Sequence, residues 1–128
     1  MTGFVIDSYA WIEFLEGSEQ GDRVRGLLGP PFEAYTPAPV VAEVASKAIR
    51  SGKDPRVAWH AIRGASVVLP LDGETARVAG ALHAEYRRRI PDFAMTDAIV
   101  LTFSRKLDAK VVTGDPHFRG MRGVEFLG

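Results

Sequence analysis

The chain has 128 residues, a length that suits a single domain over residues 1–128 with one hydrophobic core. Its 16 basic and 16 acidic residues cancel, so net charge gives no sign of a nucleic-acid or membrane partner, although a local patch of one sign can still exist. The absence of cysteine excludes disulfides, thiolate metal sites and a cysteine nucleophile, and leaves oxygen or imidazole as the ligands for any metal.

The N-terminal residues do not resemble a signal peptide, because Asp7 interrupts the first apolar run. No apolar segment approaches the roughly 20 residues that a membrane-spanning helix requires. We therefore expect a cytoplasmic protein with no membrane contact.

Short apolar segments rich in β-branched and aromatic residues recur along the chain and predict buried strands. They cover residues 3–6, 33–36, 66–69, 110–113 and 124–127. Helical spacing separates them, over residues 8–16, 38–50, from 55 onward, from Asp72 to about Arg89, and 96–107. Strands that alternate with helices predict an α/β fold whose mostly parallel sheet is covered by helices on both faces.

Two of these helices carry clear apolar stripes, and their ends carry recognisable signals. The stripes consist of Trp11, Phe14 and Leu15 in the first helix and of Val41, Val44, Ala45, Ala48 and Ile49 in the second. Ser51-Gly52 is typical of a helix end, and Asp54-Pro55 of a helix start. We expect Trp11, Phe14 and Trp59 to fill the core or an interface.

No glycine-rich phosphate-binding motif follows any strand, which disfavours dinucleotide and P-loop nucleotide binding. Acids occupy the corresponding positions instead. Asp7 directly follows the first strand, and Asp115 comes two residues after the fourth. Since ligands of open parallel sheets bind beyond the carboxyl ends of the strands, both carboxylates would share one crevice if these strands are neighbours.

Two further acids lie near helix starts. Glu43 lies about one turn into the helix over residues 38–50, and Asp97 opens the helix over 96–107. Four converging carboxylates would repel one another without a cation between them. All-oxygen ligands suit Mg²⁺ or Mn²⁺, which also bind phosphate oxygens, so the pattern favours metal-dependent phosphodiester hydrolysis.

The segments "FVIDSYAWIEFL", "PAPVVAEVASKAI", "MTDAIVLTFSRKLDAKVVTGDPHF" and "GVEFL" resemble, in order and spacing, the PIN-domain ribonucleases. The resemblance covers nearly the whole chain and is strongest to the VapC-type toxins of VapBC toxin–antitoxin pairs. It implies a three-layer α/β/α fold with a five-stranded parallel sheet in the order 3-2-1-4-5. It also implies a Mg²⁺ or Mn²⁺ cofactor, cleavage of single-stranded or looped RNA, a VapB-like antitoxin partner and a homodimer.

The family's four acidic positions map onto Asp7, Glu43, Asp97 and Asp115. Asp7 is followed by Ser8 and then a tyrosine, so only the first of two common hydroxyls is kept, and Ser8 would support a water or the neighbouring carboxylate. Asp108 stands where the family often has glycine, and it tolerates the left-handed conformation. Thr113 would orient Asp115, whereas Asp92 is a rival of Asp97 that we rank second because it follows a proline in a connecting segment.

Taken singly, each of these acids also has an ordinary interpretation as a helix cap, a turn residue or a solvated side chain. Together they are hard to explain as unrelated caps. We expect Asp115 to be the least essential of the four, because it follows a flexible Gly114. His117 is interpreted as a surface or capping residue rather than a metal ligand or base.

Arginines near helix ends are usually solvated, but a nuclease would use some of them to contact backbone phosphates. The candidates are Arg87, Arg88, Arg105 and Arg119. The alternative function is a catalytically inactive PIN-like module that binds RNA or protein, although inactive members typically lose acids and this chain keeps all four. The RNA target, the number of metal ions, and a toxin as against a housekeeping role stay open.

Overall fold

The computed structural model describes residues 2–128 and confirms the predicted sheet. The strands are β1 (Gly3–Ile6), β2 (Glu33–Pro37), β3 (Val67–Leu69), β4 (Lys110–Thr113) and β5 (Val124–Phe126). They lie in the order β3-β2-β1-β4-β5, and every neighbouring pair is parallel. Residues of β1 pair with β4 in register from Phe4 opposite Lys110 to Ile6 opposite Val112, so these two strands end side by side.

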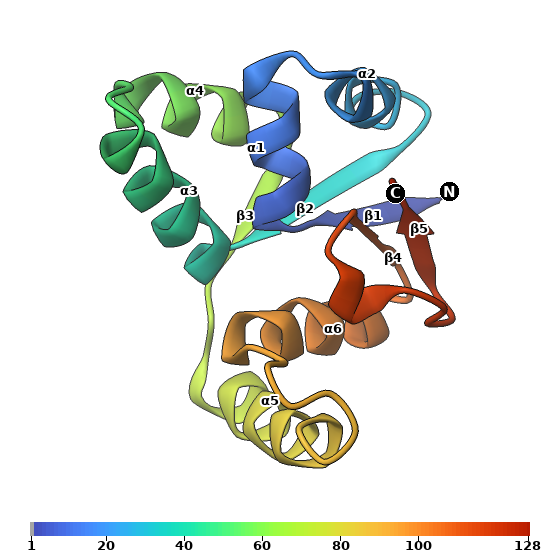
Figure 1. Cartoon of the computed structure of the whole chain (residues 1–128). Coiled ribbons are helices and arrows are strands. Elements are labelled where there is room, and N and C mark those ends of the chain that lie inside the picture. Colours follow the sequence, from blue (N-terminus) through green and yellow to red (C-terminus); the bar gives the residue numbers. More distant parts are fainter. Residues whose placement is uncertain (1) are drawn as a thin grey trace.

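Helices cover both faces of the sheet. They are α1 (Ser8–Glu16), α2 (Glu19–Arg25), α3 (Ala38–Arg50), α4 (Pro55–Ala65), α5 (Gly73–Tyr86) and α6 (Met95–Leu107), with a short 3₁₀ helix η1 (Pro116–Phe118). Figure 1 shows α1 to α4 on one side of the sheet and α5 with α6 on the other. The predicted three-layer architecture is therefore confirmed.

Within residues 2–128, no helix combines the length and apolar character that a membrane span would need.

Most element ends match the predictions, but α2 and η1 were not predicted. Helix α2 buries only Gly21 and Val24, so it has no apolar stripe for a periodicity argument to detect. Its N-cap Ser18, whose hydroxyl accepts a hydrogen bond from the Gly21 N–H, was the available signal. A Cβ at Gly21 would overlap the Glu13 carbonyl, so glycine is what allows α2 to lie this close to α1.

Helix α5 ends at Tyr86 rather than near Arg89. The segment continues as turns to Ile90, whose N–H donates to the Tyr86 carbonyl. Pro91 follows, and the residue before a proline is disfavoured in the helical region. Arg87, Arg88 and Arg89, which the predicted helix included, therefore lie on a loop.

The apolar stripe of α3 also differs from the prediction. Val40 and Val44 are fully buried, and four-residue spacing continues this face to Ala48. Ile49 is one position further round the helix, about 100° away, and the residue is 62% exposed. On the neighbouring helix, Trp11 is buried as expected, and its Nε1 donates to the Thr36 hydroxyl over 3.0 Å.

Candidate metal centre

Three of the four predicted acids meet at the carboxyl edge of β1 and β4. Asp7 follows β1, and its N–H donates to the Val112 carbonyl on β4 over 3.3 Å, which holds the two strand ends together. Asp115 lies two residues beyond β4, and Asp97 is the third residue of α6. Asp7 and Asp97 are buried, and Asp115 is half-buried.

Each of these carboxylates is held by a backbone N–H at the start of a helix. The Ala10 N–H donates to Asp7 Oδ1 (2.9 Å), the Ala94 N–H to Asp97 Oδ2 (2.8 Å), and the His117 N–H to Asp115 Oδ1 (2.9 Å). The interpretation of these acids as helix caps is therefore confirmed for all three. Because each cap uses one oxygen, the same carboxylate can still offer its other oxygen to a ligand.

Burial raises the pKa of Asp7 to about 7, an effect that hydrogen bonds from Thr113 and Ala10 oppose and the charges of Asp115 and Asp97 reinforce. Burial likewise raises the pKa of Asp97, against hydrogen bonds from Ala94 and His117. Such a group of mutually repelling, poorly solvated carboxylates is what a bound cation stabilises. The residues present therefore fit a divalent metal ion.

His117 lies among these acids, and our interpretation of it as a surface residue was wrong. Its Nδ1 is 2.8 Å from Asp97 Oδ2 and 3.4 Å from Asp115 Oδ1, and its Nε2 is 3.2 Å from Asp92 Oδ2. Partial burial opposes protonation, but the bonds to Asp97 and Asp92 keep the His117 pKa above its ordinary value. The 3₁₀ helix η1, which Asp115 caps, places the ring beside the cluster, and sequence patterns do not predict so short a helix.

One oxygen each of Asp97 and Asp115 and one ring nitrogen of His117 lie within 4.8 Å of one another in the described part of the chain. Asp7 is outside this group, although its charge interacts with those of Asp97 and Asp115. His117 Nδ1 is bonded to Asp97 Oδ2, so the nitrogen is placed to position that carboxylate, and the carboxylate oxygens are the ligands that suit Mg²⁺ or Mn²⁺.

The remaining predicted residues lie around this cluster. Glu43 is exposed on α3, and its Oε2 accepts a hydrogen bond from the Thr96 hydroxyl, beside Asp97, over 3.3 Å. Thr113 is buried, and its hydroxyl accepts the Asp115 N–H over 3.0 Å. Ser8 begins α1 and is half-buried next to Asp7.

Asp92 is exposed at the rim, where it contacts His117 rather than joining the group of three acids. This contact lowers the Asp92 pKa, chiefly through the hydrogen bond with His117.

The reason given for ranking Asp115 last is also wrong. Gly114 is buried, and a Cβ there would overlap the ring of Tyr9, so this glycine permits close packing rather than flexibility. Of the predicted phosphate-binding arginines, Arg105 and Arg119 line a cavity beside His117. Arg87 and Arg88 are exposed on the loop after α5 and do not line that cavity.

The family model described as PIN domain matches residues 4–124, and the chain therefore belongs to the PIN domain family. No curated protein sequence matches the chain.

Several solved structures share the fold over nearly the whole chain. A toxin–antitoxin complex from Klebsiella pneumoniae matches with 18% identity, 97% coverage of each chain and a TM-score of 0.74. VapC20 of Mycobacterium tuberculosis, described as a sarcin–ricin loop cleaving toxin, matches with 17% identity, 95% of this chain, 97% of its own and a TM-score of 0.76. VapBC2 from Rickettsia felis, bound to a promoter DNA fragment, matches with 12% identity, 96% of each chain and a TM-score of 0.74. The likeness confirms the predicted PIN fold.

Proposed function

We propose that this protein is a Mg²⁺- or Mn²⁺-dependent endoribonuclease that cuts single-stranded or looped RNA and acts as the toxin of a type II toxin–antitoxin pair. The observation that carries the proposal is the convergence of Asp7, Asp97 and Asp115 at the ends of two adjacent parallel strands and one helix. Membership of the PIN family and the VapC-like fold support it. Its place of action would be the cytoplasm, and its assembly a homodimer.

The side chains divide into holding and orienting roles. Asp7, Asp97 and Asp115 would hold the cation, which when bound supplies charge that polarises a phosphodiester and makes a water acidic. Glu43, bonded to Thr96 at the rim, would orient the attacking water, either directly or through a second water. His117 would keep the Asp97 carboxylate in its orientation.

Cleavage of a labelled single-stranded RNA by the purified protein tests the proposal. Activity is expected with Mg²⁺ or Mn²⁺ and not with EDTA, and Asp7→Asn and Asp97→Asn should each lose at least about 100-fold, since each removes a charged ligand of the cation. Asp22→Asn, an exposed acid on α2, is the matched control and should cleave as the wild type does. Retained cleavage in the two site variants would contradict the mechanism.

An inactive RNA-binding module would behave differently in a calorimetric titration with Mn²⁺. The nuclease proposal predicts heat of binding that Asp97→Asn reduces. An RNA-binding protein that takes up no divalent ion would instead support the module.

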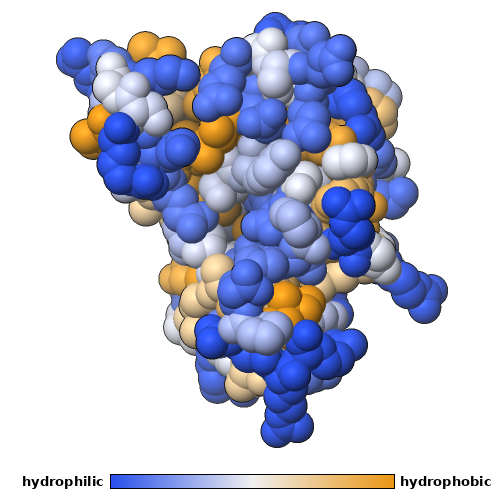
Figure 2. Space-filling view, viewed as in Figure 1, coloured by the Kyte–Doolittle hydropathy of each residue, from blue (hydrophilic) through white to orange (hydrophobic). Residues whose placement is uncertain are grey.

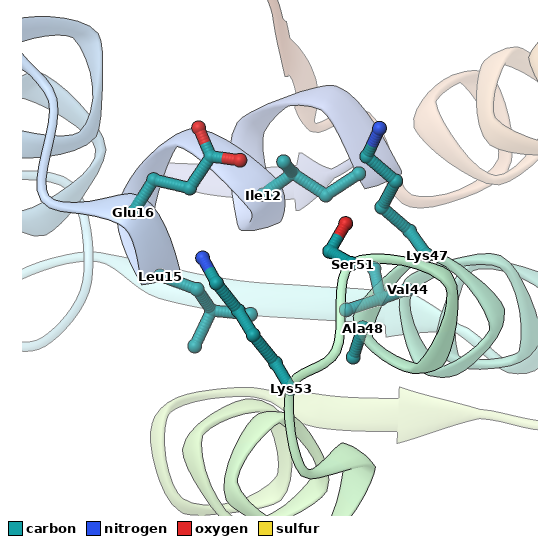
Figure 3. Close-up of a pocket in the computed structure, with 8 residues that line it drawn as sticks. All are labelled: Ile12, Leu15, Glu16, Val44, Lys47, Ala48, Ser51 and Lys53. Atoms are coloured by element: carbon teal, nitrogen blue, oxygen red, sulfur yellow. The ribbon is translucent and has the colours of Figure 1, made fainter.

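The surface between α1 and the α3–α4 pair suits the proposed antitoxin partner. Figure 2 shows apolar colour in this hollow, and Figure 3 shows its lining side chains. Ile12, Leu15 and Ala48 supply apolar surface, and Lys47, Lys53 and Glu16 are the charged residues that line it. The hollow continues along α4 past Val57, a residue that is 63% exposed. An apolar segment of the antitoxin would lie here, with acidic residues facing the lysines.

Ala48→Arg should place a long charged side chain in this hollow without touching the metal centre. The variant is expected to cleave RNA normally and to escape inhibition by the proposed antitoxin. Ala81→Arg, an exposed alanine on α5, serves as the control. Normal inhibition of Ala48→Arg would exclude this surface as the docking site.

A further inference from the structure

Four arginines gather around one cavity beside the metal centre. Arg89 follows α5, Arg105 lies in the last turn of α6, and Arg119 and Arg122 lie between η1 and β5. Together with His117 they line a cavity of about 410 Å³. Among residues 2–128, the ion pairs involve other cations, so these four guanidinium groups face no carboxylate partner at ion-pair distance. We call this cluster of four the arginine pocket.

The chain holds part of this cluster in place. Arg105 Nη2 donates to the Tyr86 hydroxyl over 2.9 Å, and the Arg105 and Arg89 guanidinium carbons lie 5.9 and 4.9 Å from the centre of the Tyr86 ring. The Tyr86 ring in turn stacks on the buried Phe93 ring at 5.2 Å and 23°. Guanidinium groups fixed against an aromatic ring lose less conformational entropy when they bind a ligand.

Positive charge also continues away from the metal centre. Arg105 and Arg122 line a second cavity of about 500 Å³, which extends to Lys110 at the start of β4. The surface therefore leads from His117, at the proposed reacting end, along a strip of arginines to a lysine. One acid, Asp108, lines the second cavity, and no acid among residues 2–128 lines the first.

We propose that the arginine pocket binds the sugar–phosphate backbone of the RNA strand on one side of the cleaved bond. This inference rests on the proposed nuclease function and adds the binding path of its substrate. Arginine suits the task because its planar guanidinium donates two parallel hydrogen bonds to a phosphate. Contacts of this kind fix the position of the strand while reading no sequence, so the pocket sets register rather than target choice.

Binding of a fluorescein-labelled, mixed-sequence single-stranded oligoribonucleotide, measured by anisotropy in EDTA over a series of NaCl concentrations, tests the proposal without turnover. Arg105→Gln/Arg122→Gln should weaken binding by about five-fold or more and lower the slope of log K against log salt by about 1.4, at about 0.7 for each lost phosphate contact. Arg105→Lys/Arg122→Lys keeps the charge but loses the paired hydrogen bonds, so its affinity for RNA should lie between those of the wild type and the Gln variant. Arg50→Gln/Arg63→Gln, exposed on α3 and α4, is the matched control and should leave both affinity and slope unchanged.

The results distinguish the proposal for the arginine pocket from the proposal of nuclease activity. Unchanged affinity and salt slope in the Gln variant, or no RNA binding by the wild type, would overturn the pocket. A poly-glutamate peptide of matched length that binds as tightly as RNA, and loses binding in the same variant, would assign the surface to an acidic protein segment and also overturn it. RNA binding that depends on the pocket, in a protein that cleaves no RNA with any divalent ion, would uphold the pocket and refute only the proposed activity.

Discussion

Asp7, Asp97 and Asp115 each serve two purposes at once. A backbone N–H holds one oxygen of each carboxylate at the start of a helix, which stabilises the local fold. The same bond limits rotation of the carboxylate, so that the group is oriented before any ligand arrives. The cost is electrostatic, because the three charges repel and two of them are buried.

The raised pKa of Asp7 makes a prediction about stability. Its pKa is about 7 in the fold and 3.8 as the ordinary value, so between these two pH values the folded protein holds a proton that the unfolded chain has lost. The metal-free fold therefore loses stability as pH rises from about 4 to about 7, because Asp7 ionises freely in the unfolded chain but stays protonated when buried. At about 1.4 kcal/mol per pH unit, the penalty reaches at most about 4 kcal/mol above pH 7.

Asp7→Asn removes that penalty and keeps a good N-cap. Thermal unfolding in EDTA should show the variant more stable than the wild type at pH 8, with the difference shrinking toward pH 4. Saturating Mn²⁺ should stabilise the wild type more than the variant. A variant that is less stable than the wild type at pH 8 in EDTA would show that burial of Asp7 carries no such cost.

His117 is expected to act through Asp97. His117→Ala removes the Nδ1 contact at 2.8 Å and should weaken Mn²⁺ binding, measured by calorimetry at pH 8, about ten-fold, the lower range for loss of a residue that orients a metal ligand. His117→Gln should recover part of the affinity, since its amide can donate to the same oxygen. His60→Ala, exposed on α4, is the control, and equal Mn²⁺ affinity in all four proteins would rule out the positioning role.

For single residues, the sequence predicted which charged side chains would meet, but not how the His117 ring would be oriented. The positions of Asp7, Asp97 and Asp115 relative to strand and helix ends predicted that they would meet. The place of His117 depends on the 3₁₀ turn at residues 116–118, whose single turn carries no periodic signal. The shared position of Arg105 and Arg119 was likewise not predictable from local patterns, because the cavity that they line is formed by segments far apart in the sequence.

Among the elements, α1 packs against the loop after β4, which carries Asp115 of the candidate metal centre. Tyr9 on α1 covers Gly114, and its hydroxyl donates to Gln20 Oε1 on α2 over 2.7 Å. The tyrosine therefore connects two helices to the loop that carries Asp115. It occupies the position where the family often has a second small hydroxyl residue.

Gly114→Ala should destabilise the protein by about 1–3 kcal/mol, because the added methyl group overlaps the Tyr9 ring. Tyr9→Ala/Gly114→Ala should show a smaller additional loss from the glycine substitution, since the obstructing ring is absent. Chemical denaturation of the four proteins gives the coupling energy. Additive losses would mean that the two residues do not pack against each other in solution.

The elements that the sequence predicted well are those with a buried stripe or a capped start. Helix α4 begins at Pro55 after the Asp54 cap, and α3 ends at Arg50 before Ser51, as the local signals indicated. Helix α2 was not predicted because its contacts depend on Gly21, and glycine usually marks a break in a helix. Ile49 was misassigned because spacing alone does not say which edge of a stripe faces the core.

In the whole molecule, the three proposed sites lie in different parts of the layered fold. The metal centre lies at the carboxyl edge of the sheet, the arginine pocket adjoins α5 and α6, and the proposed antitoxin surface lies on α1, α3 and α4 in the opposite layer (Figure 1). A partner on the α1 side could therefore be altered without changing contacts of the arginine pocket. Alternation of strands and helices predicted a covered parallel sheet, but the order 3-2-1-4-5 came from the family resemblance, because alternation alone permits other orders.

The most direct test of the central claim is the chemistry of the RNA ends that the protein produces. Attack by a water held at the carboxylate cluster, with the 3′ oxygen leaving, predicts fragments with 5′-phosphate and 3′-hydroxyl ends. These ends should form only with Mg²⁺ or Mn²⁺ and disappear in Asp97→Asn. Fragments with 2′,3′-cyclic phosphate ends, formed equally in EDTA and by Asp97→Asn, would contradict the account.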